Sequence, residues 1–84
     1  MKTFRQYLKE DSLPYRFDYV NQHGDVIMYD DVDAKEDADA IKRARIQWEK
    51  LLRRGEAGPG TDIAEIHVKR ISGRNSYMRI RTIY

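Results

Sequence analysis

The chain has 84 residues, of which 40% are hydrophobic and 36% are charged, and it contains no cysteine. This length builds one small domain, which excludes large enzymes, multidomain architectures and repeat arrays. The lack of cysteine excludes disulfide bonds, thiolate catalysis and zinc sites built on cysteine.

Charge separates along the chain, although the formal net charge is only +2. Residues 1–39 carry five bases and ten acids, a net charge of −5. Residues 40–84 carry eleven bases and four acids, a net charge of +7. Such asymmetry indicates either a surface for a charged partner or two halves that attract each other in the fold.

Residues 1–13 predict a short helix and a linker. Thr3 and Gln6 form a capping box, in which the hydroxyl and the amide each bind a free backbone N–H, and Pro14 prevents the helix from continuing. The segment lacks the apolar centre of a signal peptide, and no apolar run in the chain approaches the roughly 18 residues that cross a bilayer. We therefore expect a cytoplasmic domain that does not bind membranes.

Two strand pairs follow this segment. Residues 15–20 and 25–30 alternate as half-buried strands do, and the turn between them ends in Gly24, which tolerates a positive φ. Residues 63–69 and 76–84 read as a second pair of strands joined by a turn. Each pair predicts an antiparallel hairpin.

The segment between the hairpins predicts one long amphipathic helix. Asp33 and Glu36 resemble a second capping box at its start. Its apolar stripe consists of Ala38, Ile41, Ala44, Trp48, Leu51 and Leu52. The predicted fold class is α+β, with one helix packed on a four-stranded, mainly antiparallel sheet. Residues 1–84 then form a single domain, in which the N-terminal helix and linker (1–13) precede a ββαββ core (14–84).

The helix covers one face of such a sheet and leaves the other face uncovered. Alternation assigns to the covered face Phe17, Tyr19, Val26, Met28, Ala64, Ile66, Val68, Met78 and Ile80. The uncovered face receives Arg16, Asp18, Ile27, Tyr29, Glu65, His67, Lys69, Tyr77, Arg79 and Arg81. It is therefore expected to carry four bases and two acids, together with two tyrosines and a histidine.

The interleaved basic and aromatic side chains of the uncovered face fit three interpretations. Single-stranded nucleic-acid binders use cations for phosphates and rings for base stacking, and each stack contributes roughly 1–3 kcal/mol. A protein partner is favoured equally, because Tyr and Arg are enriched at interface hot spots. The third interpretation is structural: long Arg and Lys stems shield the strands while their charged ends stay hydrated.

Candidate catalytic and metal-binding patterns do not meet the requirements of their chemistry. The acidic run of residues 30–37 lacks the glycine and the terminal glutamate of a calcium loop. His23 and His67 have no cysteine and no second histidine near them in the sequence, and metal ligation would need at least one further ligand. The glycines of residues 55–60 follow a helix and precede a strand, which is the reverse of a phosphate loop. We therefore predict no catalytic residues, no metal and no cofactor.

Two segments resemble proteins of large tailed bacteriophages. The opening sequence MKTFRQYLKE (residues 1–10) looks like the start of many small accessory proteins of these phages. Residues 29–48, a strand passing through an acidic cap into an Ala-rich helix, are similar to small phage inhibitors of host RNA polymerase. The resemblance implies a phage accessory protein that acts in the host cytoplasm by binding a host or viral macromolecule.

The function predicted from these observations is a small non-enzymatic binding module whose uncovered sheet face engages a protein partner. The alternative is a single-stranded nucleic-acid binder that uses the same face. A homodimer through an edge strand would in addition bury a free strand edge. The predicted binding residues are Arg16, Tyr29, His67, Lys69, Tyr77, Arg79 and Arg81.

Overall fold

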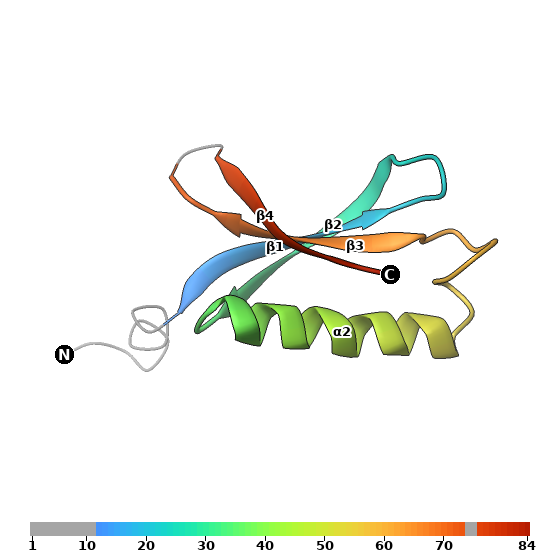
Figure 1. Ribbon diagram of the computed structural model, residues 1–84, viewed down its shortest axis with the longest axis horizontal. Coiled ribbons are helices and arrows are strands. Elements are labelled where there is room, and N and C mark those ends of the chain that lie inside the picture. Colours follow the sequence, from blue (N-terminus) through green and yellow to red (C-terminus); the bar gives the residue numbers. More distant parts are fainter. Residues whose placement is uncertain (1–11, 74–75) are drawn as a thin grey trace.

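The structure is a computed structural model that describes residues 12–73 and 76–84. Its elements are β1 (Leu13–Val20), β2 (Val26–Ala34), α2 (Asp37–Arg53), β3 (Glu65–Ile71) and β4 (Tyr77–Ile83). The four strands form one antiparallel sheet, and α2 lies across one face of it (Figure 1). This architecture confirms the predicted α+β class, with one helix on a four-stranded sheet. The predicted N-terminal helix falls on residues 1–11, which lie outside the described residues.

The strand order in the sheet is β2-β1-β3-β4. β1 pairs with both β2 and β3, and β3 pairs with β4, so that each neighbour runs antiparallel. The connection from β2 to β3 therefore crosses β1, and α2 forms most of this connection. Within the described residues, β2 and β4 are the two edges, and each presents one row of backbone N–H and C=O groups without a neighbouring strand.

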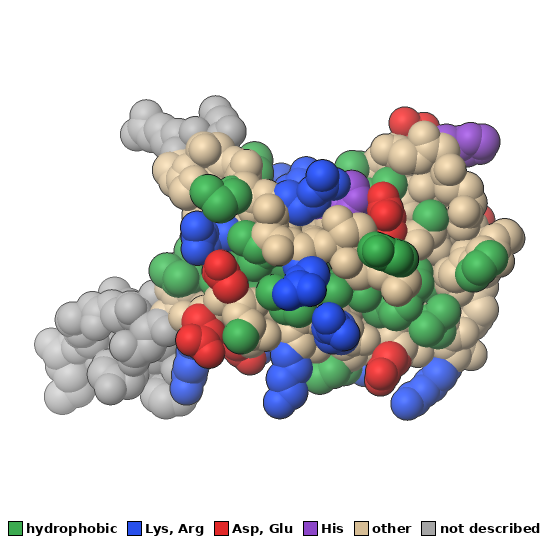
Figure 2. All heavy atoms as spheres, viewed as in Figure 1, with side chains coloured by type: hydrophobic (Ala, Val, Ile, Leu, Met, Phe, Trp, Pro, Cys, Tyr) green, Lys and Arg blue, Asp and Glu red, His purple; other side chains and the backbone are tan. Residues whose placement is uncertain are grey.

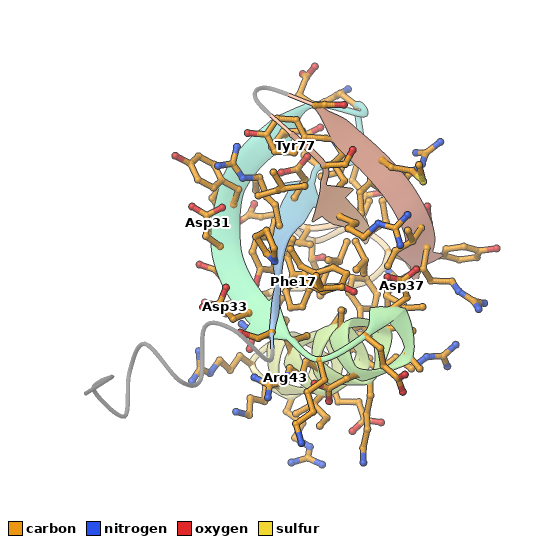
Figure 3. The ribbon with its side chains drawn as sticks, turned by 90° about the vertical axis from the view of Figure 1, so that its left-hand side faces the viewer. Phe17, Asp31, Asp33, Asp37, Arg43 and Tyr77 are labelled. Carbon is orange, nitrogen blue, oxygen red and sulfur yellow. The ribbon has the colours of Figure 1, made fainter. Side chains whose placement is uncertain are left out.

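The core lies between α2 and the sheet face formed by alternate residues of the two central strands. Tyr15, Tyr19, Ile66 and Val68 are fully buried there. Figure 3 shows Phe17, also buried, between the sheet and α2. The buried residues of the helix are Ala40, Ala44, Trp48 and Leu51. Because the first two are alanines, the helix backbone can approach the sheet closely.

β2 is longer than predicted, and α2 begins later than predicted. The ladder between β1 and β2 continues to the pair Leu13–Ala34, and Ala34 is buried. Asp33 is therefore a strand residue, whereas Glu36 is the N-cap residue of α2 and makes no side-chain capping hydrogen bond. The predicted capping box was wrong, because the cross-strand hydrogen bonds with β1 hold this segment extended. Asp37 lies in the first turn of α2, where a carboxylate is favoured by the helix dipole.

A bulge in β4 changes the expected faces of its second half. The register between β3 and β4 shifts between Val68 and Lys69, so that Ile80 has no partner among the paired residues. Ile80 packs against the core, and Ile83 is buried in it. Strict alternation would place two residues that are three apart on opposite faces. The bulge thus lets both isoleucines contact the core, and it places Arg81 opposite Val68 on the helix side of the sheet.

Three apolar residues that alternation assigned to the covered face are about half exposed. They are Val26, Met28 and Met78, with exposed fractions of 51%, 47% and 50%. All three lie on the edge strands, toward the hairpin ends that bend away from α2 in Figure 1. The helix therefore covers mainly the two central strands, and much of the apolar surface of the edges remains at the surface.

Candidate functional site

We call the sheet face turned away from α2 the open face. Residues directly opposite each other on neighbouring strands share a face. Since Phe17 and Val68 are opposite each other in the core, the residues beside them in β1 and β3 point to the open face. The register of β2 and β4 adds residues from the edges. The described ionisable and aromatic residues of the open face are Arg16, Asp18, Tyr29, Asp31, Asp33, Glu65, His67, Lys69, Tyr77 and Arg79.

Arg16 lies between two tyrosine rings of the open face. Its guanidinium carbon is 4.2 Å from the centroid of the Tyr29 ring and 4.9 Å from that of the Tyr77 ring. Arg16 Nε donates a hydrogen bond of 2.8 Å to Oδ1 of Asp31, and this bond raises the pKa of the guanidinium above its ordinary value. Figure 3 shows Tyr77 at the far side of the sheet from α2. One cation on β1 therefore joins rings from both edge strands by cation–π contacts.

Lys69 is held by a buried carboxylate. Asp18 is only 6% exposed, and its carboxylate forms an ion pair with the Lys69 ammonium. A buried carboxylate that lost its cation would keep an uncompensated charge in a site with little water. Lys69 therefore belongs to a structural ion pair, and a phosphate ligand would have to compete with Asp18 for it.

His67 links an acid and a base on the same face. Its Nε2 is 2.8 Å from Oε1 of Glu65, and its Nδ1 is 3.5 Å from Nη1 of Arg79. Because a guanidinium can only donate, Nδ1 accepts from Arg79. Nε2 then carries the proton that is donated to the Glu65 carboxylate, which fixes one tautomer of the imidazole.

The open face lacks the basic excess that alternation predicted. Arg81 lies on the helix side, where it lines a hollow of about 240 Å³ together with Arg45, so the prediction that it shares the uncovered face was wrong. The longer β2 adds Asp31 and Asp33 to the open face. Its described residues are therefore three bases and four acids, apart from His67.

Six of the seven predicted binding residues share the open face. They are Arg16, Tyr29, His67, Lys69, Tyr77 and Arg79. Three of them form the stack described above, whereas Lys69 and His67 contact carboxylates of the same face. Sequence reasoning missed Asp31, which orients the stack. The alternation that starts at Tyr29 and continues through residues 31 and 33 would have found it.

On the helix side, two buried tyrosines each bind one aspartate. Tyr19 Oη donates a hydrogen bond of 2.6 Å to Asp30, and Tyr15 Oη donates one of 2.7 Å to Asp37, which also accepts from Arg70 at 3.2 Å. Burial in the first place, and the bonded carboxylate in the second, raise the pKa of Tyr15 to about 12 and that of Tyr19 above its ordinary value. Both phenols are therefore neutral donors at neutral pH, and these two acids of the run 30–37 are bound within the fold.

Exposed apolar side chains gather on the two edge strands. Six of the ten large apolar residues that are exposed in the described chain lie there, each between 43% and 56% exposed. They are Val26, Ile27, Met28, Tyr29, Tyr77 and Met78. Figure 2 shows hydrophobic atoms at the surface near both raised hairpin ends, interrupted by charged side chains. Single apolar residues at a surface are ordinary, but their concentration on the two edge strands marks these strands as candidate interaction surfaces.

The part of the chain that the structure describes holds no group of three or more His, Cys, Asp or Glu side chains that could bind a metal ion. No helix within residues 12–73 and 76–84 is long and apolar enough to cross a membrane. Comparison of the chain with protein-family models, with curated proteins and with solved structures gives no match. Function is therefore inferred from the open face itself.

Proposed function

We propose that the domain is a non-enzymatic binding module whose open face packs against another protein. The observation that carries this proposal is the stack of Arg16 between Tyr29 and Tyr77, two residues that are 56% and 43% exposed. Tyrosine and arginine are the residue types that supply much of the binding energy at protein interfaces. The phage accessory role that the resemblance implies agrees with this proposal, because such a protein would act by binding a macromolecule.

The stack supports binding because it is ordered before a partner arrives. Ordering a side chain with many rotamers costs about 0.5–1.5 kcal/mol on association. Arg16 is already held by the Asp31 carboxylate and by two rings in the free domain. A partner that covers the rings therefore gains apolar contact without first immobilising the arginine.

Charge favours a protein over a nucleic acid at this face. A single strand of nucleic acid would also stack on the two tyrosines, but its phosphates need an excess of cations. Among the residues that the structure describes, the open face offers three bases and four acids, and Lys69 is paired with the buried Asp18. Nucleic-acid binding is therefore retained only as an outcome of the test below.

The experiment compares three immobilised proteins in a lysate of the source cells. The first is the wild type, and the second is the open-face variant Tyr29→Ala/Tyr77→Ala. The third is the helix variant Ile46→Ala/Leu52→Ala, a matched control that removes two exposed apolar side chains from α2. Retained proteins are identified by mass spectrometry, and the affinity of each purified candidate is then measured by calorimetry for all three proteins.

The proposal expects one protein that binds the wild type and the helix variant alike and loses at least tenfold in affinity for the open-face variant. Equal affinity for all three proteins would show that the stack is not the interface. Oligonucleotide binding that weakens steeply with salt and is lost in the open-face variant would instead support the nucleic-acid alternative. Circular dichroism of each variant checks that the fold is kept.

A further inference from the structure

The two edge strands of the sheet carry opposite charge. β2 exposes Asp30, Asp31 and Asp33 and contains no basic residue, whereas β4 exposes Arg79 and Arg81 and contains no acidic residue. An edge strand is a template on which another chain can pair. We propose that β4 of one copy of this domain adds to β2 of the next copy, so that copies associate head to tail in one continuous sheet. This inference stands independently of the proposed binding function.

Symmetric pairing of the same edges is opposed by like charge. Full antiparallel overlap of two β2 strands places Asp30 of one copy opposite Asp30 of the other, and that of two β4 strands places Arg79 opposite Arg81. Like charges placed opposite each other across a strand pair are destabilising. Pairing β4 with β2 places opposite charges there instead. Such a contact leaves one unpaired edge at each end, so the assembly grows and does not close as a dimer.

The strand directions fit this arrangement. β2 runs antiparallel to β1, β1 to β3, and β3 to β4. β2 and β4 therefore run in opposite directions within one sheet. When a second copy continues the sheet in the same orientation, its β2 lies antiparallel to the β4 that it joins, which is the pairing already used throughout the sheet.

The side chains along the two edges match in the same direction. Read backward, β2 gives its three aspartates first and then the apolar residues 26–29. Read forward from Arg79, β4 gives its two arginines first and ends at Ile83, and the exposed Tyr84 comes directly after the strand. Antiparallel pairing therefore brings acids to bases and apolar residues to apolar residues in one alignment.

The charges also correspond on the two faces of the sheet. Arg79 points to the open face, as do Asp31 and Asp33, whereas Arg81 and Asp30 lie on the helix side. Because α2 runs along β1 and β3 (Figure 1), the width of the helix decides whether the helices of neighbouring copies fit side by side. Four strands at about 4.8 Å spacing give each copy about 19 Å of sheet width. A helix with its side chains is about 10–12 Å wide, which is narrower.

The test is the size of the protein in solution as concentration and salt change. Analytical ultracentrifugation of the wild type at low salt should give a sedimentation coefficient that rises with concentration and passes the value of a dimer. Added salt should return it toward a single copy, because exposed ion pairs are screened. A wild type that stays a single copy at every concentration would show that the charges keep the edges apart, and would overturn the proposal.

Two charge-reversal variants test the pairing itself. Asp31→Lys/Asp33→Lys makes both edges basic, and Arg79→Glu/Arg81→Glu makes both edges acidic. Each variant alone should stay a single copy. An equal mixture should recover association, because the basic β2 of one variant then meets the acidic β4 of the other. A mixture that stays dispersed, or a wild type that stops at a dimer of fixed size, would overturn the proposal.

The control keeps the charge change and moves it away from both edges. Lys42→Glu/Lys50→Glu on α2 alters the net charge as the arginine variant does, and it should associate as the wild type does. Thermal melting followed by circular dichroism checks each fold, since reversing Asp31 also removes the partner of Arg16. If Asp31→Lys/Asp33→Lys unfolds, the arginine variant Arg79→Glu/Arg81→Glu is added to the wild type instead. The arginine variant should shorten the assemblies, because its β2 can pair with the β4 of a wild-type copy while its own acidic β4 cannot pair with another β2. Assemblies of unchanged size would contradict the proposal.

Discussion

Tyr15→Phe removes one hydroxyl from the helix side of the sheet and leaves the ring in the core. The lost hydrogen bond is 2.7 Å long and ends on the Asp37 carboxylate. A hydrogen bond to a charged group contributes about 1.5–3 kcal/mol. Asp37 keeps its contact with Arg70, and its side chain is 41% exposed, so water can replace the phenol. We therefore expect a loss at or below the lower end of that range, about 1–1.5 kcal/mol.

Thermal unfolding followed by circular dichroism measures this loss. For a domain of this size, 1 kcal/mol lowers Tm by about 4–8 °C, so Tyr15→Phe should lower it by roughly 4–12 °C. Tyr77→Phe is the matched control, because it deletes a hydroxyl from a ring that is 43% exposed. It should change the free energy of unfolding by less than about 0.5 kcal/mol.

A double-mutant cycle separates the hydrogen bond from other effects of the hydroxyl. In the background of Asp37→Ala, Tyr15→Phe should cost almost nothing, because the acceptor is gone. An equal loss in both backgrounds would refute the assignment of the stabilisation to this bond. A loss in Tyr15→Phe no greater than that in Tyr77→Phe would refute it as well.

The remaining predictions concern pH, the buried ion pair and the core. The pKa of Tyr15 is raised from an ordinary 10.0 to about 12, so the fold favours the neutral phenol. The stability that the fold gains from this preference is present below pH 10 and is lost as the pH rises toward 12. Urea unfolding across this range should show the decline, and Tyr15→Phe should weaken it; an unweakened decline would contradict the assignment. Lys69→Met leaves the Asp18 carboxylate, 6% exposed, without its cation and should cost about 3–5 kcal/mol in urea unfolding, where an unchanged midpoint would argue against the ion pair. Ile66→Ala, at a fully buried position, should cost about 2–5 kcal/mol. Ile27→Ala, at 47% exposure, should cost less than about 0.5 kcal/mol, and similar losses in the two variants would disprove the placement of the core.

Local sequence patterns predicted the elements well because each element carries its own signal. The aromatic alternation of residues 15–20 and the apolar stripe of the helix depend on near neighbours only. The end of β2 was missed because acidic residues are common at helix starts, and the pairing with Leu13 that holds the strand extended is a contact between distant residues. The secondary-structure propensities of neighbouring residues do not predict a contact between residues that are distant in the sequence.

The candidate site was predicted in part for the same reason. Alternation identified Arg16, Tyr29 and Tyr77 as members of one face. The contact between Arg16 and Tyr77 depends on the strand order. β4 lies two strands away from β1, so these two long side chains must reach across β3 to meet. The face of Arg81 depends on a bulge, which strict alternation along β4 does not take into account.

The bulge in β4 means that isoleucine spacing, not arginine placement, decides where positive charge appears on this sheet. Ile80 and Ile83 both reach the core only if one residue is looped out, and Arg81 is carried to the helix side as a result. Exchanging the residues at 82 and 83, so that the second isoleucine falls two positions after the first, would let β4 alternate regularly. Arg81 would then lie on the open face, which would become more basic with no change in the composition of the chain.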